Sequence, residues 1–197
     1  MNLVSIFALL ILDVTPALAH VGIHAGLGST ASFAAGVAHP LSGLDHVAVM
    51  VAVGLWAALK GGRALWLWPA TFVGVMLIGG ALGMAHVALP LVEPGILASV
   101  VALGLLVALA VDLPLWIGAA IIGLFAVFHG HAHGSEVAEN VGGFEYMAGF
   151  AIATATLHAT GIAFAQLMTR AQLRPAIRIA GGLCVFVGLV MFGGALS

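Results

Sequence analysis

The chain has 197 residues, of which 63% are hydrophobic and only 6% are charged, and its mean hydropathy is +1.24. Soluble globular domains carry about a quarter charged residues, so this composition indicates an integral membrane protein. The net charge of −2, with only five lysines and arginines, excludes a nucleic-acid-binding surface, which needs clustered basic side chains. Because a membrane-spanning helix uses about 20 residues, about six helices would fill the chain and leave no room for a soluble catalytic domain.

Residues 1–19 have the pattern of a secretory signal peptide. An apolar core is followed by Pro16 and by Ala17-Leu18-Ala19, which has the small-x-small form that signal peptidase cleaves. We expect cleavage before His20, which would leave residues 20–197 as one six-helix transmembrane domain with its amino terminus outside. An uncleaved first helix is the alternative, because no Lys or Arg precedes the apolar core.

The first membrane helix after residue 20 is expected to be broken. Residues 29–59 would form a helix about 46 Å long if it were continuous, whereas the hydrocarbon core of a bilayer is about 30 Å thick. Pro40 lacks a backbone donor and disfavours helical geometry at His39. We therefore predict a short outer segment, a break at Pro40, and a spanning helix from about Ser42. The further spans are expected at residues 65–89, 95–111, 114–131, 144–169 and 177–196.

Loop charges predict the orientation of this all-α, polytopic helix bundle. Every basic residue falls in the loop between the first and second spans or around the connection of the fifth span to the sixth. With an outer amino terminus both regions are cytoplasmic, in agreement with the positive-inside rule. The histidines then collect in the outer half of the bundle. The basic residues are Lys60, Arg63, Arg170, Arg174 and Arg178.

The tryptophans are expected at the membrane surface. Trp is enriched at membrane–water interfaces, where the apolar ring meets lipid and the ring N–H meets water. All four lie near the predicted cytoplasmic ends of their helices, so we interpret them as interfacial anchors and not as parts of a site. They are Trp56, Trp66, Trp68 and Trp116.

The first polar cluster is His39-Pro40-Leu41-Ser42-Gly43-Leu44-Asp45-His46, at the predicted break. An ionisable side chain inside a bilayer costs at least a few kcal/mol unless it meets a partner, an ion or water, so this stretch is a candidate site. Imidazole with carboxylate suits borderline divalent ions such as nickel, cobalt, zinc or copper(II). The alternative is a self-satisfied polar cluster, in which Asp45 accepts a hydrogen bond from a histidine and stabilises the broken helix.

The second polar cluster is Phe128-His129-Gly130-His131-Ala132-His133-Gly134-Ser135-Glu136, at the outer end of the fourth span. If the helix persists, His129 and His133 share one face and Glu136 neighbours His133, a spacing that lets two side chains chelate one ion. The two glycines in this stretch make fraying an equal alternative. The segment would then be a solvated, His-rich loop.

The pattern His39-Pro40-x-x-Gly43-x-Asp45-His46, together with Phe128-His129-Gly130-x-Ala132-His133-Gly134-x-Glu136, closely resembles the two signature motifs of the HupE/UreJ family of bacterial nickel permeases. Residues 92–95 and 157–162 match as well, so the resemblance covers essentially the whole chain after residue 19. It implies a permease domain that is not an enzyme and imports Ni2+ across the bacterial inner membrane, with a periplasmic amino terminus, for hydrogenase or urease maturation. Co2+ and Zn2+ stay open as transported ions.

The expected metal ligands form a main set and an accessory set. The resemblance gives five of the main positions, and the helical spacing adds His129. The main set is His39, Asp45, His46, His129, His133 and Glu136. His158 is placed near the middle of the fifth span, as a second stop for an ion. The accessory candidates are His20, His24, His86, Glu93, His131 and His158.

Two other function classes stay open. In an intramembrane hydrolase the same histidines and aspartate would hold a catalytic zinc with one position open to water, although the chain has no HExxH or GxSxG motif. A non-transporting metal sensor or chaperone would bind the ion without moving it. The expected partners are the lipid bilayer and the divalent ion; no P-loop or ATPase subunit is evident in the sequence, and a homo-oligomer is left open.

Overall fold

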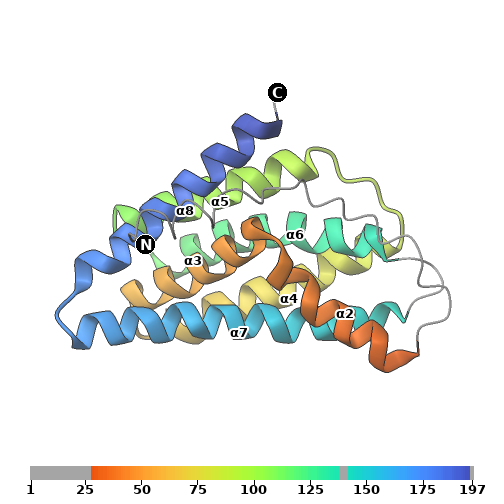
Figure 1. Cartoon of the computed structure of the whole chain (residues 1–197), viewed down its shortest axis with the longest axis horizontal. Coiled ribbons are helices and arrows are strands. Elements are labelled where there is room, and N and C mark those ends of the chain that lie inside the picture. The colour runs from red at the N-terminus through yellow and green to blue at the C-terminus, as the bar shows by residue number, and fades with distance from the viewer. Residues whose placement is uncertain (1–27, 138–141, 196–197) are drawn as a thin grey trace, which may run out of the picture.

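The computed structural model describes residues 28–137 and 142–195, and in this part of the chain every regular element is a helix (Figure 1). The predicted signal peptide and the candidate ligands His20 and His24 lie outside the described residues. The all-α class is therefore confirmed for the described part. Its helices are α2 (Ser29–Ser42), α3 (Leu44–Lys60), α4 (Ala64–Met84), α5 (Val92–Ala108), α6 (Leu115–Glu136), α7 (Gly143–Arg170) and α8 (Arg174–Ala195).

Four of these helices, α4, α6, α7 and α8, are long and apolar enough to cross a membrane. Helices α2 and α3 pass the same test only together, as a pair bent by 81°, and would make a fifth span. Helix α5 is apolar but has 17 residues, which is about 26 Å of helix. Length and composition thus support a multi-pass membrane protein, while the count of six spans stays a prediction.

The break in the first span lies at Gly43 and not at Pro40. Pro40 is inside α2, which continues to Ser42 before Gly43 takes an extended conformation with φ −96° and ψ 121°. A proline loses the hydrogen bond of its own nitrogen and its ring crowds the carbonyl four residues earlier, which can kink a helix without ending it at that residue. The Ser42 hydroxyl then donates to the carbonyl oxygen of His39 at 2.6 Å, which satisfies one of the acceptors left open at the helix end.

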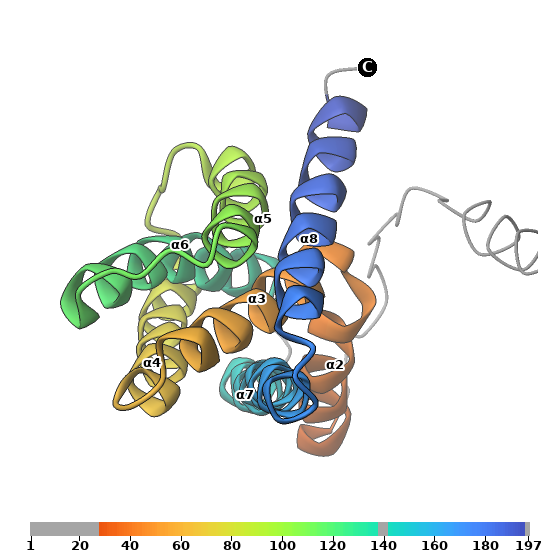
Figure 2. The ribbon, with the colours of Figure 1, turned by 90° about the vertical axis from the view of Figure 1, so that its left-hand side faces the viewer.

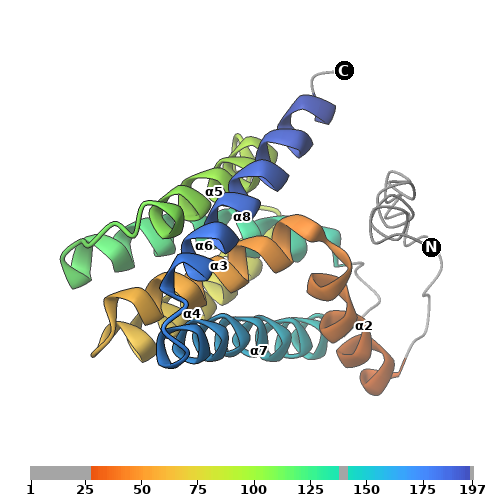
Figure 3. The same cartoon turned by 60° about the vertical axis from the view of Figure 1, so that its left-hand side comes forward.

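The helices pack in pairs: α4 on α6, α5 on α8, and both α2 and α3 on α7. Helix α8 runs obliquely to the others and its C-terminal end points away from them (Figures 2 and 3). The approach of α4 to α6 needs small residues, because a Cβ at Gly130 would overlap the carbonyl group of Met76 and one at Gly134 would overlap the backbone of Gly80. This packing accompanies a helix that persists through Glu136, so the frayed alternative is wrong.

The basic side chains gather at one end of the bundle, where α3 and α7 end and α4 and α8 begin (left in Figure 1). At this basic end Lys60 pairs with Asp112 at 2.5 Å, and Arg178 donates to a carbonyl oxygen of α5. At the opposite end, α6 finishes with Glu136 and α7 begins with Glu145 in its first turn. We call this the histidine end. The membrane side that each end faces stays a prediction.

Two of the four tryptophans are not at the surface. Trp56 and Trp68 are fully buried with ring centroids 4.3 Å apart, and both ring N–H groups donate to carbonyl oxygens where α5 connects to α6. Trp66 and Trp116 are exposed, as expected of interfacial anchors. The prediction was wrong for the first pair because a buried carbonyl satisfies an indole N–H as water does.

Candidate metal site

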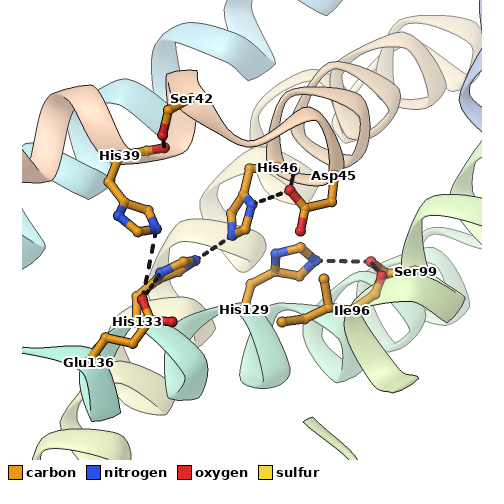
Figure 4. Close-up of polar contacts among 9 residues, drawn as sticks. All are labelled: His39, Ser42, Asp45, His46, Ile96, Ser99, His129, His133 and Glu136. Carbon is orange, nitrogen blue, oxygen red and sulfur yellow. Dashed lines mark hydrogen bonds and ion pairs between the residues drawn. The ribbon is translucent and has the colours of Figure 1, made fainter. Parts of the chain in front are cut away.

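Three helices bring four imidazoles together toward the histidine end of the bundle (Figure 4). His39 comes from the last turn of α2, His46 from the first turn of α3, and His129 and His133 from α6. The ring centroid of His133 lies 4.6 Å from that of His39 and 4.5 Å from that of His46, and His46 lies 5.2 Å from His129. The bend at Gly43 makes this possible, because it turns the start of α3 so that both motif histidines meet α6.

Asp45 fixes the hydrogen position on the His46 ring. Its Oδ1 accepts the backbone N–H of His46 at 2.9 Å and contacts the ring Nδ1 at 2.7 Å. Because an ionised carboxylate only accepts, the hydrogen of a neutral His46 ring lies on Nδ1 and the lone pair on Nε2. That Nε2 faces the Nε2 of His133. A carboxylate that orients an imidazole in this way is typical of metal sites.

Ser99, on α5, fixes the hydrogen position on His129. The Ser99 hydroxyl donates to the carbonyl oxygen of Ile96 at 2.5 Å and contacts Nε2 of His129 at 2.9 Å. A hydroxyl has one hydrogen, so Nε2 of His129 is the donor in the second contact and Nδ1 carries the lone pair. This Nδ1 is buried without a hydrogen-bond partner among the described residues. An unpaired buried acceptor costs free energy, and a cation would relieve that cost.

Glu136 lies at the most exposed side of the histidine cluster. Its Oε2 is 3.4 Å from Nδ1 of His133 and 3.8 Å from Nε2 of His39. These three side chains each offer one ligand atom, and the atoms lie within 4.8 Å of one another, a spacing that suits one metal ion. The Glu136 side chain is 54% exposed, whereas that of His133 is 3% exposed. The carboxylate is therefore the accessible member of the set.

Aromatic rings form one wall of the cluster. Phe150, on α7, has its ring centroid 4.4 Å from that of His133 and 6.2 Å from that of His46. Tyr146, one turn earlier, lies 6.1 Å from His39. An apolar wall lowers the local dielectric and strengthens the attraction between a cation and its ligands. The nitrogen and oxygen donors with this wall fit a borderline divalent ion such as Ni2+, Co2+ or Zn2+.

The remaining described candidates do not join this cluster. His131 is buried elsewhere on α6, and its Nε2 donates to the carbonyl oxygen of Val87 at 2.7 Å, which anchors the segment after α4. His86 and Glu93 are exposed, just after α4 and in the first turn of α5. His158 is buried farther along α7 from the histidine end. The main set thus comes together, with Asp45 bonded to His46, while the accessory set is dispersed.

The sequence pattern did not single out Ser99 as part of the site. A serine in an apolar helix commonly donates to its own backbone, as Ser99 does to Ile96, so the residue alone carries no signal. Its contact with His129 depends on the packing of α5 against α6, which one sequence does not encode in any short motif. The one hint in the sequence was that Ser99 is the single polar residue after Glu93 in this apolar helix.

The chain is similar to known proteins over most of its length. The family model described as HupE / UreJ protein matches residues 8–191, a range that includes both histidine motifs. The protein HupE of Rhizobium leguminosarum bv. viciae is 44% identical over 176 residues, which cover 89% of this chain and 90% of that protein. No solved structure matches the chain.

Proposed function

The chain belongs to the HupE / UreJ family, and from this premise we propose that it is a secondary transporter that imports a divalent transition metal ion across the bacterial inner membrane. Ni2+ is the expected ion, and its destination is hydrogenase or urease maturation. The observation that carries the proposal is the convergence of imidazole lone pairs within an apolar helix bundle. His46 and His133 face each other through Nε2, and His129 keeps an unpaired Nδ1 beside them.

The different exposure of the ligands suggests an order of events. An arriving ion first meets the exposed carboxylate of Glu136 and the half-buried ring of His39. It then exchanges water for the buried nitrogens of His133 and His46, which lie deeper in the same cluster. Asp45 offsets part of the ion's charge through His46. Metal binding displaces protons from imidazoles, so exchange of the ion against protons is chemically available.

The charge distribution supports an inward direction for this transport. The basic end carries the lysine and the four arginines, which lie at or near helix ends, and positive charge next to the ends of membrane helices favours the cytoplasmic side. With the basic end in the cytoplasm, the histidine end faces the periplasm. The ligand cluster then binds the ion from the periplasmic side, and the ion is released at the cytoplasmic side, toward Lys60 and Arg170.

Uptake by the purified full chain in proteoliposomes tests the proposal. Radiolabelled Ni2+ should accumulate with time above the level in protein-free vesicles, and Co2+ and Zn2+ added in excess rank the selectivity. A pH gradient across the vesicle membrane should change the rate if protons are exchanged. Binding without accumulation would instead indicate a sensor or chaperone. Peptide hydrolysis that depends on zinc would indicate a hydrolase.

A further inference from the structure

A second metal-binding position lies behind the outer cluster. We infer that His158 is an inner coordination point, which takes the ion from the outer cluster on its way to the basic end. This inference rests on the proposed function for its role in transport, but the binding of a metal at His158 is testable by itself. Four observations carry it: the face of α7, the position of Phe72, the depth of His158, and its unpaired nitrogens.

One face of α7 connects the two positions. Tyr146, Phe150, Thr154 and His158 follow one another at intervals of four residues, so each neighbours the next along a stripe that winds slowly around the helix. The first two rings wall the outer cluster. The Thr154 hydroxyl contacts the sulfur of Met76 on α4 at 3.7 Å. The same face therefore leads inward from the outer cluster to His158.

Phe72, on α4, contacts a histidine of each position. Its ring centroid lies 5.8 Å from that of His129 and 5.1 Å from that of His158, and all three side chains are buried. Helices α4 and α7 run in opposite directions, so this contact lies one turn farther from the histidine end than the contact of Met76 with Thr154. One aromatic ring thus separates the last outer nitrogen ligand from the inner imidazole.

Helix spacing gives the depth of the inner position. His129 lies about 10 Å from the end of α6 at Glu136, at 1.5 Å per residue. His158 lies about 22 Å from the start of α7 at Gly143, which is at the same end of the bundle. The two imidazole centroids lie no more than about 11 Å apart, because the Phe72 centroid is 5.8 Å from one and 5.1 Å from the other, so an ion that passes between them moves at most roughly a third of a bilayer core.

His158 has unused ligand atoms. It is 1% exposed, and neither of its ring nitrogens has a hydrogen-bond partner among the described residues. Buried polar atoms of this kind call for an explanation, and an ionisable side chain in a membrane helix is by default a functional candidate. A groove of about 390 Å³ between α4 and α7 borders the ring; its lining includes Leu65, Pro69, Val73, Ala155 and Ile162.

The donors around this position suit transient binding. One imidazole, with a hydroxyl at Thr154 and a thioether at Met76 one turn away, offers fewer and weaker ligands than the outer cluster. A conducted ion needs sites that are favourable enough to enter and weak enough to leave. With one imidazole as its nearest nitrogen ligand, the inner point would bind a cation weakly enough to release it.

Two substitutions at His158 separate metal binding from packing. His158→Phe keeps a flat ring but has no ligand atom, whereas His158→Cys keeps a metal ligand but loses the ring. Both are made in a Cys184→Ala background, so that no native thiol is present. Each protein is reconstituted separately, and the wild-type protein is the reference. His158→Phe should lower the Ni2+ uptake rate by about tenfold or more, and His158→Cys should keep most of the wild-type rate. Equilibrium binding to the outer cluster should be unchanged in both.

Absorption spectroscopy tests the inner point without transport. Added Co2+ should produce a sulfur-to-metal charge-transfer band in purified His158→Cys protein. Leu157→Cys, the matched control at the neighbouring position, should produce none. Absence of the band, or wild-type uptake by His158→Phe, would overturn the inference while leaving the proposed function in place. Absence of uptake by the wild-type protein would overturn the proposed function, and the band would still decide whether His158 binds a metal.

Discussion

The Nε2 atom of His46 on α3 contacts the Nε2 atom of His133 on α6, across 87 positions of sequence. Asp45 holds the ring hydrogen of His46 on Nδ1, so His46 presents a lone pair to its neighbour. The Glu136 carboxylate lies 3.4 Å from Nδ1 of His133, and that nitrogen has no hydrogen-bond partner among the described residues. His133 therefore keeps a ring nitrogen free to bind an ion beside the lone pair of His46. For this reason we place the outer ion at His46 and His133.

Replacement of Asp45 by Asn should weaken metal binding without removing a direct ligand. The amide keeps the size of the side chain but loses the charge that favours a hydrogen on Nδ1 of His46. Changes to such orienting carboxylates lower metal affinity by about 10- to 100-fold. Titration of purified Asp45→Asn with Ni2+ measures the effect. Asp112→Asn, which removes an exposed carboxylate at the basic end, is the control and should bind as wild type does.

Ser99→Ala should weaken binding through His129. Without the hydroxyl, Nε2 of His129 loses its acceptor, and the ring hydrogen is free to move to the Nδ1 atom that faces the cluster. We expect the Ni2+ affinity to fall by roughly tenfold, as for other changes next to a metal ligand. Thr156→Ala, which removes a hydroxyl that only donates to its own helix, is the control. Equal Ni2+ affinities for Ser99→Ala and Thr156→Ala would show that Ser99 does not position His129.

Gly130→Ala should destabilise the bundle by separating α6 from α4. The added Cβ would overlap the carbonyl group of Met76, and overpacking of this kind costs about 1–3 kcal/mol. A Cβ added at Gly123 would lie at ordinary contact distance from α4, 3.7 Å from a side-chain carbon of Thr71 and 3.8 Å from one of Val75. Gly123→Ala should therefore leave stability unchanged or raise it by up to about 1 kcal/mol through helix propensity. Unfolding of both variants in detergent measures the free energies, and similar values for the two would contradict the packing argument.

Ni2+ binding should weaken in acid. Only an unprotonated imidazole nitrogen binds a metal, so protons and Ni2+ compete for the same atoms. The affinity should therefore fall in acid, once the pH is low enough to protonate the imidazoles. Calorimetry in buffers with different ionisation enthalpies counts the protons released for each ion bound. An affinity that persists when the imidazoles are protonated would indicate that they are not the ligands.

Much of the fold follows from the composition of the chain, because a span must be long, apolar and free of charges. The starts and ends of α3 to α8 lie close to the predicted spans for this reason. The position of the break was less predictable, since the sequence offers both Pro40 and Gly43 as helix breakers. The proline is accommodated within α2 and the glycine takes the extended conformation, and the two helices on either side of it both pack against α7.

The site was predictable to the extent that its residues lie in two short motifs. An imidazole or carboxylate stands out in apolar sequence, so the pattern singled out the main set of candidate ligands, and the structure brings these side chains together. That they bind a metal stays a prediction. The pattern could not tell that His131 turns to the Val87 carbonyl while its neighbours His129 and His133 turn inward. That difference depends on the rotation of α6 against α4. Neither Ser99 nor the buried tryptophans differ in sequence from ordinary packing residues.

Uptake by His46→Ala tests the central claim most directly. Wild-type protein, His46→Ala and the control Thr156→Ala are reconstituted in equal amounts, and their radiolabelled Ni2+ uptake is followed in the same vesicles. The account predicts that His46→Ala inserts normally but accumulates no more Ni2+ than protein-free vesicles, because the lone pair that faces His133 is gone. Accumulation by His46→Ala at the wild-type rate would show that the ion does not pass through this cluster.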